Sequence, residues 1–287
     1  MGYMTPEASS KKRVVLITGA SAGFGKACAE HLGQRGLQVY GTSRSACFDA
    51  DSPSKSQKQP SFFTIPMDVR DTTSVETGIR YILDKEEHID IVVNNAGFGL
   101  AGAFEDCSVE EIKGQFETNV FGVVRVCQAL IPHMRQRKQG IIVIVGSLAG
   151  RIGIPFQSAY SASKFALEGF AESLRMEVKP FGIQVVLIEP GDFKTHFTRN
   201  RMVAEKSREN SIYTPVFKRA VGVMENDEQN GPPPADLARL LERILQTPSP
   251  ALRYPAGKIP PRLAVKLKAV LPGKVFEWLV MKAYKLR

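Results

Sequence analysis

Hydrophobic residues along most of the chain form short, nearly continuous runs that alternate with longer amphipathic stretches. Nearly continuous apolar runs are typical of parallel strands that are covered on both faces. Strands are predicted at 13–17, 38–42, 62–65, 89–93, 141–145 and 184–188, and helices at 23–35, 72–86, 109–137 and 158–179. This alternation predicts an α/β fold with a doubly wound parallel sheet, Rossmann-like, with helices on both faces.

Two segments depart from this rhythm. Residues 45–61 are polar, contain two prolines and are predicted to form an extended surface loop. Beyond Thr195 the alternation fades, until a triple proline introduces a predicted helix at 234–246. For a chain of 287 residues we expect one domain over 1–287. Its parts are a core at about 12–195, a substrate-side segment at about 195–230 and a small C-terminal helical extension at 231–287.

Composition and cysteine usage indicate the cellular compartment in which the protein is located. Hydrophobic residues make up 43% and charged residues 23%, which is ordinary for a soluble globular protein. The chain contains no uncharged apolar run long enough for a transmembrane helix, and residues 1–10 lack the apolar stretch of a secretory signal. The four cysteines are widely spaced and form no C-x-x-C pair, which argues against a metal site or a disulfide framework. We therefore expect a cytoplasmic protein that at most contacts a membrane face, and no bound metal.

The net charge of +9 has more than one reading. Nucleic acid is not expected as a partner because no recognised binding motif accompanies the charge. Residues 262–287 contain seven cations against one acid, Glu277, interspersed with apolar side chains. A basic amphipathic segment of this kind can lie on an anionic membrane surface, which would make a peripheral membrane contact. The alternative is packing against this enzyme or a second copy, which is the more common fate of an apolar helix face.

The first predicted strand leads directly into a glycine-rich turn, Thr18-Gly19-Ala20-Ser21-Ala22-Gly23-Phe24-Gly25. A strand, a glycine turn and a helix N-terminus together form an anion site, because backbone N–H groups point outward and the helix dipole favours phosphate. A turn that merely joins strand to helix is the alternative. The cofactor contacts predicted in this turn are Gly19, Ser21, Gly23, Phe24 and Gly25.

The end of the second strand bears on the choice of cofactor. An acid at this position would bind the ribose hydroxyls of NAD(H), whereas an arginine accommodates the 2′-phosphate of NADP(H). Here the strand is followed by Ser43 and Arg44, with no acid. The pattern favours NADP(H) over NAD(H), because a guanidinium presents a planar fork to phosphate. A solvated surface arginine is the alternative reading.

Two further turns follow strands at the same predicted edge of the sheet. Asn94-Asn95-Ala96-Gly97 follows the fourth strand, at the carboxyl edge where ligands bind in open α/β sheets. Asn95, Ala96 and Gly97 are therefore candidate cofactor contacts, and the alternative is a run that forms only a strand-ending turn. Asp68 follows the third strand and either contacts adenine or caps the next segment. We also assign its neighbour Val69 to the cofactor contacts.

The residues that carry chemistry follow the fifth strand. Ser147 comes directly after it, and Tyr160 and Lys164 are spaced i and i+4 on a predicted helix, so their side chains share a face. A nearby cation favours the phenolate, so we expect Lys164 to lower the pKa of Tyr160. Ser147 can hydrogen-bond the same substrate oxygen. A Tyr/Lys pair with this spacing usually has no function when it occurs alone. Here its position after the strand that leads to Ser147 favours a catalytic role.

In this order, the TGxxxGxG, NNAG, Ser, YxxxK and PG elements resemble the short-chain dehydrogenase/reductase family, over roughly Val14 to Thr195. The resemblance implies Asn119 as a fourth catalytic residue beside Ser147, Tyr160 and Lys164, holding a water that links Lys164 to solvent. It also implies that Tyr160 and Lys164 contact the cofactor. Further implied contacts near the nicotinamide are Pro190, Gly191, Phe193 and Thr195.

Several stretches look like the 17β-hydroxysteroid and retinol dehydrogenase branch of that family. They are Asn95-Ala96-Gly97-Phe98-Gly99-Leu100, Gly153-Ile154-Pro155-Phe156, Ser163-Lys164-Phe165-Ala166-Leu167-Glu168-Gly169 and Leu252-Arg253-Tyr254. This likeness implies a small hydrophobic alcohol or carbonyl substrate that is steroid-, retinoid- or lipid-like. The predicted substrate contacts are Ser147, Leu148, Ile154, Phe156 and Tyr160, with 195–223 as a further candidate segment. Ala22 and the loop 45–61 depart from the family pattern and leave cofactor affinity and loop behaviour open.

The expected activity is NADP(H)-dependent hydride transfer between the nicotinamide and an alcohol or ketone, with Tyr160 as general acid/base. The alternative is a non-catalytic NADP-binding sensor or scaffold. Loss of Tyr160 or Lys164 would have favoured that alternative, and both are present. Family members are commonly dimers or tetramers built on the long helices, so we expect a homodimer or homotetramer through 109–137 and 158–179.

Overall fold

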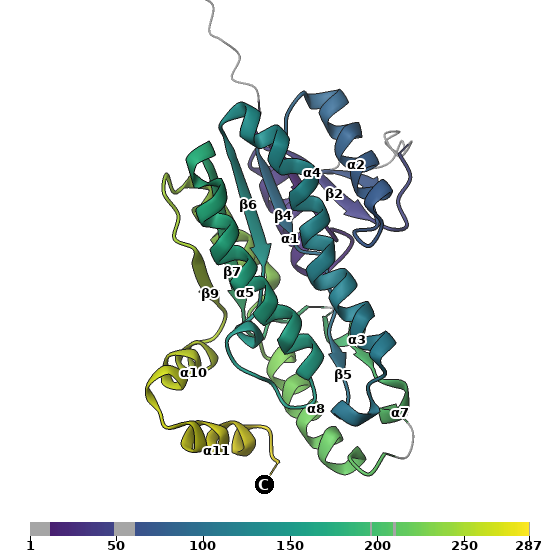
Figure 1. The fold of residues 1–287 in the computed structure, drawn as a ribbon, viewed down its shortest axis with the longest axis vertical. Helices are drawn as coiled ribbons and strands as arrows, with labels where there is room; N and C mark the ends of the chain where they lie inside the picture. The colour runs from purple at the N-terminus through teal and green to yellow at the C-terminus, as the bar shows by residue number, and fades with distance from the viewer. Residues whose placement is uncertain (1–11, 49–60, 196, 209–210, 287) are drawn as a thin grey trace, which may run out of the picture.

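In the computed structural model, residues 12–48, 61–195, 197–208 and 211–286 are described. The predicted loop 45–61 lies largely outside these residues. Seven parallel strands form the main sheet, in the order β3-β2-β1-β4-β6-β7-β9 (Figure 1). Their bounds are β1 Val14–Ile17, β2 Gln38–Ser43, β3 Phe63–Pro66, β4 Ile91–Asn94, β6 Gly140–Val145, β7 Ile183–Pro190 and β9 Arg253–Ala256. The predicted doubly wound sheet is confirmed, and the strand order reverses between β1 and β4, where such sheets bind ligands.

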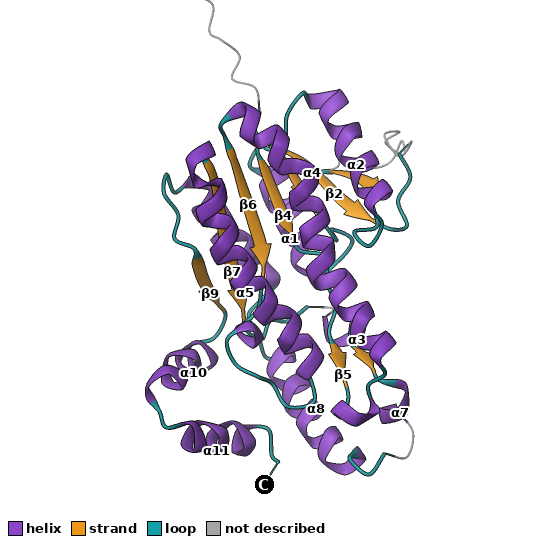
Figure 2. Cartoon of the chain, viewed as in Figure 1, coloured by secondary structure: helices purple, strands orange, loops and turns teal. Residues whose placement is uncertain are grey.

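Helices cover both faces of the sheet (Figure 2). Because neighbouring side chains of a strand point to opposite faces, Val14 and Leu16 of β1 belong to one hydrophobic cluster and Val15 and Ile17 to the other. The first cluster is closed by helices α2 (Thr72–Glu86), α4 (Gly122–Arg137) and α5 (Ser158–Val178). The second is closed by α1 (Gly23–Gln34) and α9 (Pro234–Gln246).

The long helix predicted at 109–137 contains one π-helical turn. It begins as α3 (Val109–Phe116), passes through a π-helical turn, η2 (Glu117–Phe121), and continues as α4. Ser108 and Glu111 form a capping box that begins α3. Single π-helical turns inside helices are rare and occur frequently at functional sites. The helix predicted at 109–137 is therefore confirmed, and the structure adds the π-helical turn that contains Asn119.

The segment after β7 lies below the carboxyl ends of the strands in Figure 1, together with short elements that follow β4. Its main element is α8 (Thr214–Gln229), which the fading sequence pattern did not predict. The short elements here are β5 (Leu100–Ala101), η1 (Phe104–Asp106), α6 (Phe197–Asn200), β8 (Met202–Val203) and α7 (Glu205–Arg208), and β5 pairs with β8 in a separate small sheet. The remaining short turns are η3 (Leu148–Gly150) and η4 (Lys179–Phe181).

The chain ends in two helices, α10 (Ile259–Val270) and α11 (Gly273–Ala283), at the lower left of Figure 1. Within the described part of the chain, no helix has the length and apolar character needed to cross a bilayer. The same residues contain no group of three or more side chains suited to hold a metal ion. All four cysteines are free thiols.

Candidate active site

The glycine-rich turn between β1 and α1 has no space for side chains at two of its glycines. Gly19 has φ +66°, and a Cβ there would lie 2.9 Å from Ala96 Cα. A Cβ on Gly25 would lie 2.3 Å from the Gly19 carbonyl oxygen. Ala22 caps α1 without a side-chain hydrogen bond, and no acid follows in the first turn. The backbone N–H groups at this end of α1 thus lack a side-chain partner, which fits a dinucleotide pyrophosphate.

Hydrogen bonds hold this turn to the neighbouring Asn95 turn. Thr18 Oγ1 accepts from the backbone N–H groups of Asn95 and Ala96, each at 3.0 Å. The Asn95 amide donates to the carbonyl oxygens of Thr18 at 2.9 Å and Gly19 at 3.0 Å. The Asn95 side chain therefore positions the cofactor turn instead of facing outward. Ser21 lies exposed on the turn.

The carboxyl ends of β2 and β3 bring two guanidinium groups close to one acid. Arg70 donates to Asp68 through Nη2 at 2.6 Å and Nε at 3.0 Å. This ion pair holds the pKa of Asp68 below its usual value, and the charge of the exposed Arg44 adds to the effect. Asp68 is not the N-cap of α2, which is Asp71, but its Oδ1 accepts from the backbone N–H of Arg70 at 3.0 Å and so caps the turn before that helix. The sequence analysis did not identify Arg70 as a residue of this site.

Two other predicted cofactor residues near this edge have different surroundings. Ser43 Oγ lies 3.1 Å from Ser45 Oγ, next to Arg44. Val69 is buried, and its side chain packs so closely on Gly122 that a Cβ there would lie 2.8 Å from Val69 Cγ2. Only the backbone of Val69 is therefore available to a ligand.

The structure brings Ser147, Tyr160 and Lys164 together at the carboxyl end of β6. Lys164 Nζ donates to Val145 O at 2.9 Å and lies 5.8 Å from the centroid of the Tyr160 ring. Ser147 Oγ donates to Pro190 O at 3.3 Å, and its hydroxyl acts on the Tyr160 phenol by lowering the phenol's pKa. The i,i+4 placement predicted for Tyr160 and Lys164 on one helix is confirmed.

Burial controls the protonation of both α5 residues. Desolvation raises the pKa of Tyr160 to about 12, and the Ser147 hydrogen bond opposes this only in part. The prediction that Lys164 lowers the pKa of Tyr160 below its usual value is therefore wrong for the protein alone. Desolvation also lowers the pKa of Lys164 to about 8. The pair thus combines a neutral phenol with an ammonium that loses its proton unusually easily.

Asn119 lies on the π-helical turn η2 and is 1% exposed. Its Oδ1 accepts from Phe98 N at 3.1 Å, and its Nδ2 donates to Phe98 O at 3.0 Å and to Ser163 Oγ at 3.2 Å. The amide therefore connects the turn after β4 to α5, one residue before Lys164. All of these hydrogen bonds hold the two segments together.

The predicted nicotinamide residues come from the loop after β7. Gly191 N donates to Ala256 O of β9 at 3.0 Å, which fixes the loop to the edge of the sheet. The ring of Phe193 packs edge-on against Phe24, with centroids 5.0 Å apart. A Cβ on Gly23 would lie 3.9 Å from Thr195 Cβ. The loop thus closes over the glycine-rich turn.

Two pairs of aromatic rings are formed by the predicted substrate-side residues, and one of them includes the Tyr160 phenol. Tyr160 lies 5.7 Å from Phe197 and Phe156 lies 5.6 Å from Phe217 between ring centroids. Phe197 and Phe217 belong to the candidate segment 195–223. Phe156 has φ +60°, a conformation that is uncommon for a residue with a side chain. Leu148 is buried and Ile154 half-buried beside them.

Sequence reasoning missed a buried ion pair in the same region. Arg201 Nη2 contacts Glu228 Oε1 of α8, and both residues are almost fully buried. Arg201 also lies 5.9 Å from the Phe197 ring centroid, while its Nε and Nη1 have no hydrogen-bond partner. No pattern in the sequence relates two charges 27 positions apart.

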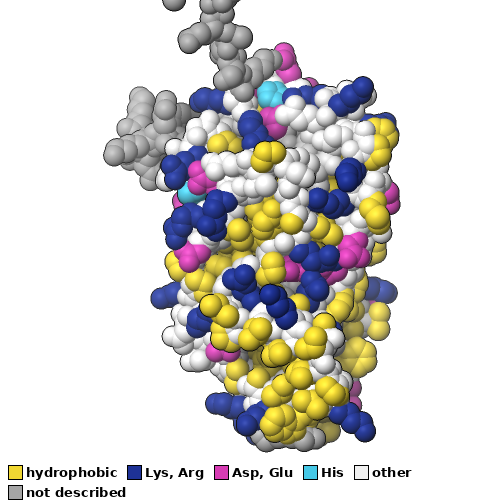
Figure 3. Space-filling view, turned by 90° about the vertical axis from the view of Figure 1, so that its left-hand side faces the viewer, with side chains coloured by type: hydrophobic (Ala, Val, Ile, Leu, Met, Phe, Trp, Pro, Cys, Tyr) yellow, Lys and Arg dark blue, Asp and Glu magenta, His cyan; other side chains and the backbone are white. Residues whose placement is uncertain are grey.

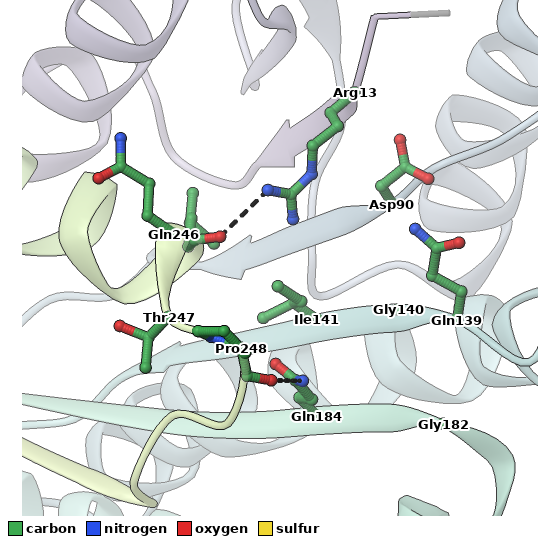
Figure 4. A pocket seen from close by; sticks show the side chains of 11 residues that line it. Arg13, Asp90, Gln139, Gly140, Ile141, Gly182, Gln184, Gln246, Thr247 and Pro248 are labelled. Atoms are coloured by element: carbon green, nitrogen blue, oxygen red, sulfur yellow. Dashed lines mark hydrogen bonds between the residues drawn. The ribbon is translucent and has the colours of Figure 1, made fainter. Parts of the chain in front are cut away.

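A polar pocket of about 230 Å³ opens at the opposite, amino end of the sheet (Figure 4). There Arg13 Nη1 donates to Leu245 O and Gln184 Nε2 donates to Pro248 O. It includes none of the predicted site residues.

Comparison with known proteins agrees with this geometry. A family model described as short chain dehydrogenase matches residues 13–206. A 3-ketodihydrosphingosine reductase of Bacteroides thetaiotaomicron is 38% identical over 275 residues, covering 96% of this chain and 99% of that protein. Dehydrogenase/reductase SDR family member 7B of Bos taurus is 31% identical over 294 residues, covering 99% of this chain and 86% of that protein.

Solved structures agree as well. A short-chain dehydrogenase of Streptomyces avermitilis has a TM-score of 0.75 at 33% identity, covering 94% of this chain and 98% of that chain. Other similar structures hold NADP in some cases and NAD in others. The chain belongs to the short-chain dehydrogenase/reductase family of oxidoreductases.

Proposed function

We propose that this protein is an NADP(H)-dependent oxidoreductase that interconverts a hydrophobic ketone and its alcohol, with Tyr160 as general acid/base. The observation that carries the proposal is the grouping of Tyr160, Ser147 and Lys164 at the carboxyl end of β6, on the same sheet edge as the glycine-rich turn. When bound, the cofactor supplies or accepts the hydride.

The chain's own residues move the proton. In the reducing direction Tyr160 donates its phenolic proton to the carbonyl oxygen, and the high pKa that burial gives the phenol keeps that proton in place beforehand. The Ser147 hydroxyl hydrogen-bonds the same oxygen. The Lys164 ammonium stabilises the phenolate left behind and reaches the nicotinamide ribose. Because the Asn119 amide is occupied by Phe98 and Ser163, a water linking Lys164 to solvent would bind the backbone of η2.

The preference for NADP(H) rests on Arg44. It is exposed at the end of β2, next to the acid that Arg70 neutralises, so this edge carries net positive charge. A charge-assisted hydrogen bond to phosphate contributes about 1.5–3 kcal/mol, which corresponds to roughly 10–150-fold in affinity. Calorimetry should show NADPH binding more tightly than NADH, with the preference lost in Arg44→Ala and kept in the matched surface variant Arg80→Ala. Equal binding of both cofactors to the wild type would refute the assignment.

The substrate is proposed to be lipid-like, because the ring of Phe197 lies next to the phenol and the same segment contributes Phe217, which packs on Phe156. The similarity to a 3-ketodihydrosphingosine reductase makes long-chain ketones the first compounds to assay, beside steroid and retinoid ones. Tyr160→Phe should lower turnover roughly 10²–10⁴-fold while NADPH binding persists. The control Tyr81→Phe alters a tyrosine on α2 and should remain active. Near-full turnover by Tyr160→Phe would refute the mechanism. Tight NADPH binding without turnover of any carbonyl compound would favour a sensor or scaffold.

Assembly and location complete the proposal. We expect a homodimer or homotetramer through the long helices at 109–137 and 158–179, where Phe121 of η2 and Met176 of α5 leave apolar surface exposed. Sedimentation of wild type and Met176→Glu would test this interface. The four free thiols fit a reducing compartment, and the cytoplasm is the proposed location.

A further inference from the structure

The two C-terminal helices leave apolar side chains exposed on their outer faces. Leu263, Leu267 and Val270 follow helical spacing on α10, and Val275, Trp278 and Leu279 do so on α11. Val270 is 75% exposed and Trp278 43%. Neither helix contains a single buried residue, whereas α9, just before them, buries five. Packing on this copy of the enzyme therefore covers only part of each helix.

Basic side chains accompany this surface. Within the described residues 258–286 the chain has seven Lys and Arg residues, all exposed, and one acid, Glu277. In Figure 3 hydrophobic side chains gather over the lower part of the molecule, with Lys and Arg side chains beside them. Lys282 lies 5.2 Å from the centroid of the Trp278 ring. An amphipathic indole with cations around it matches the interfacial region of a bilayer.

We propose that α10 and α11 form a docking surface for anionic phospholipid membranes, a property beyond the proposed catalytic function. Charge decides between a membrane and a second copy of this chain. A two-fold contact through these helices would bring together two segments that each carry seven cations and only one acid, Glu277. An anionic bilayer instead attracts each cation, while Trp278, Leu279 and Val270 enter the headgroup boundary.

The docking surface adjoins the segments that form the site. Lys268 Nζ donates to Arg151 O at 2.7 Å, just after the η3 turn that follows Ser147. A Cβ on Gly191 would lie 3.8 Å from Pro261 Cβ of α10. Arg219 of α8 donates to Lys285 O at 3.3 Å. A protein bound through α10 and α11 thus holds this edge of the site next to the bilayer.

The sole tryptophan of the chain is Trp278, so intrinsic tryptophan fluorescence reports on this surface alone. The full-length protein is mixed with phosphatidylcholine vesicles that contain phosphatidylglycerol, and with vesicles of phosphatidylcholine alone. We expect flotation with the anionic vesicles only, weakened by salt, and a shift of the emission to shorter wavelength. Absence of flotation, or an unchanged emission spectrum, would overturn the proposal.

Paired variants test the charge and apolar parts separately. Lys266→Glu with Lys274→Glu should weaken vesicle binding at least about tenfold. The control pair Lys12→Glu with Arg80→Glu changes the charge equally at remote exposed positions and should bind like wild type. Val275→Ser with Leu279→Ser should also lose binding. Equal binding by test and control pairs, or a dimer that the serine pair dissolves, would overturn the proposal. NADPH binding by every variant separates this outcome from failure of the catalytic proposal.

Discussion

Lys164 should lower the stability of the folded protein at neutral pH. It is 8% exposed, and its ammonium has one hydrogen-bond partner, Val145 O. Burial lowers its pKa from 10.5 to about 8 in the folded protein. Between these pH values the unfolded chain binds more protons at this residue than the folded chain does. The free energy of unfolding therefore rises with pH over this window, and the cost of the charge is full below about pH 8.

The size of the effect follows from the shift. One pKa unit corresponds to about 1.36 kcal/mol, so the charged Lys164 costs roughly 3 kcal/mol at about pH 7. About 2 kcal/mol of this cost should be recovered by about pH 9.5. In Lys164→Met the titrating group is absent. The difference in unfolding free energy between wild type and Lys164→Met should therefore change by about 2 kcal/mol across that interval.

Urea denaturation of both proteins at several pH values measures this difference. Subtracting one free energy of unfolding from the other cancels the contributions of all other titrating groups. The matched variant Lys218→Met removes an exposed ammonium of α8, which water solvates in either state, and should run parallel to wild type. A wild-type minus Lys164→Met difference that varies by less than about 0.5 kcal/mol between about pH 7 and about pH 9.5 would refute the desolvation argument. Lys164→Met should nevertheless lose activity, as expected where a catalytic group destabilises the fold.

Two further substitutions test packing at the site. Gly25→Ala should abolish cofactor binding and lower the free energy of unfolding by about 1–3 kcal/mol, because its Cβ would meet Gly19 O at 2.3 Å. The control Gly114→Ala on α3 meets no atom within 4 Å and should be neutral or slightly stabilising. Calorimetry measures both effects. Arg201→Met should destabilise the protein by about 3–5 kcal/mol by leaving the Glu228 carboxylate in a buried position without its cation. Adding Glu228→Leu should recover most of that loss in urea denaturation, and a double variant as unstable as Arg201→Met would contradict it.

Most of the fold could be predicted because its signals are local. The bounds of α2 and α9 agree with the predicted residues, since an Asx cap precedes Thr72 and prolines precede the first turn of α9. Strand β9 was missed because Arg253-Tyr254-Pro255-Ala256 has no apolar run. It forms the edge of the sheet, where a proline is tolerated.

Within the site, the residue types were predictable and their electrostatics were not. The spacing of the glycines and the four-residue interval between Tyr160 and Lys164 are set by local backbone geometry. They can therefore be recognised in short sequence patterns. The pKa of Tyr160 depends on burial by segments such as Phe197 that lie far along the chain, so the sign of its shift needed the structure. The same holds for the Arg70 ion pair that occupies Asp68.

The C-terminal strand offers a physical route between the two proposals. β9 pairs with β7 through Pro190, the residue at which the nicotinamide loop begins, and Gly191 N donates to Ala256 O. Three residues after Ala256, α10 starts and exposes its apolar face. Membrane binding that restrains α10 would therefore restrain the loop that closes over the glycine-rich turn. Anionic vesicles should therefore change NADPH affinity in wild type, and the change should vanish in the Lys266→Glu with Lys274→Glu pair.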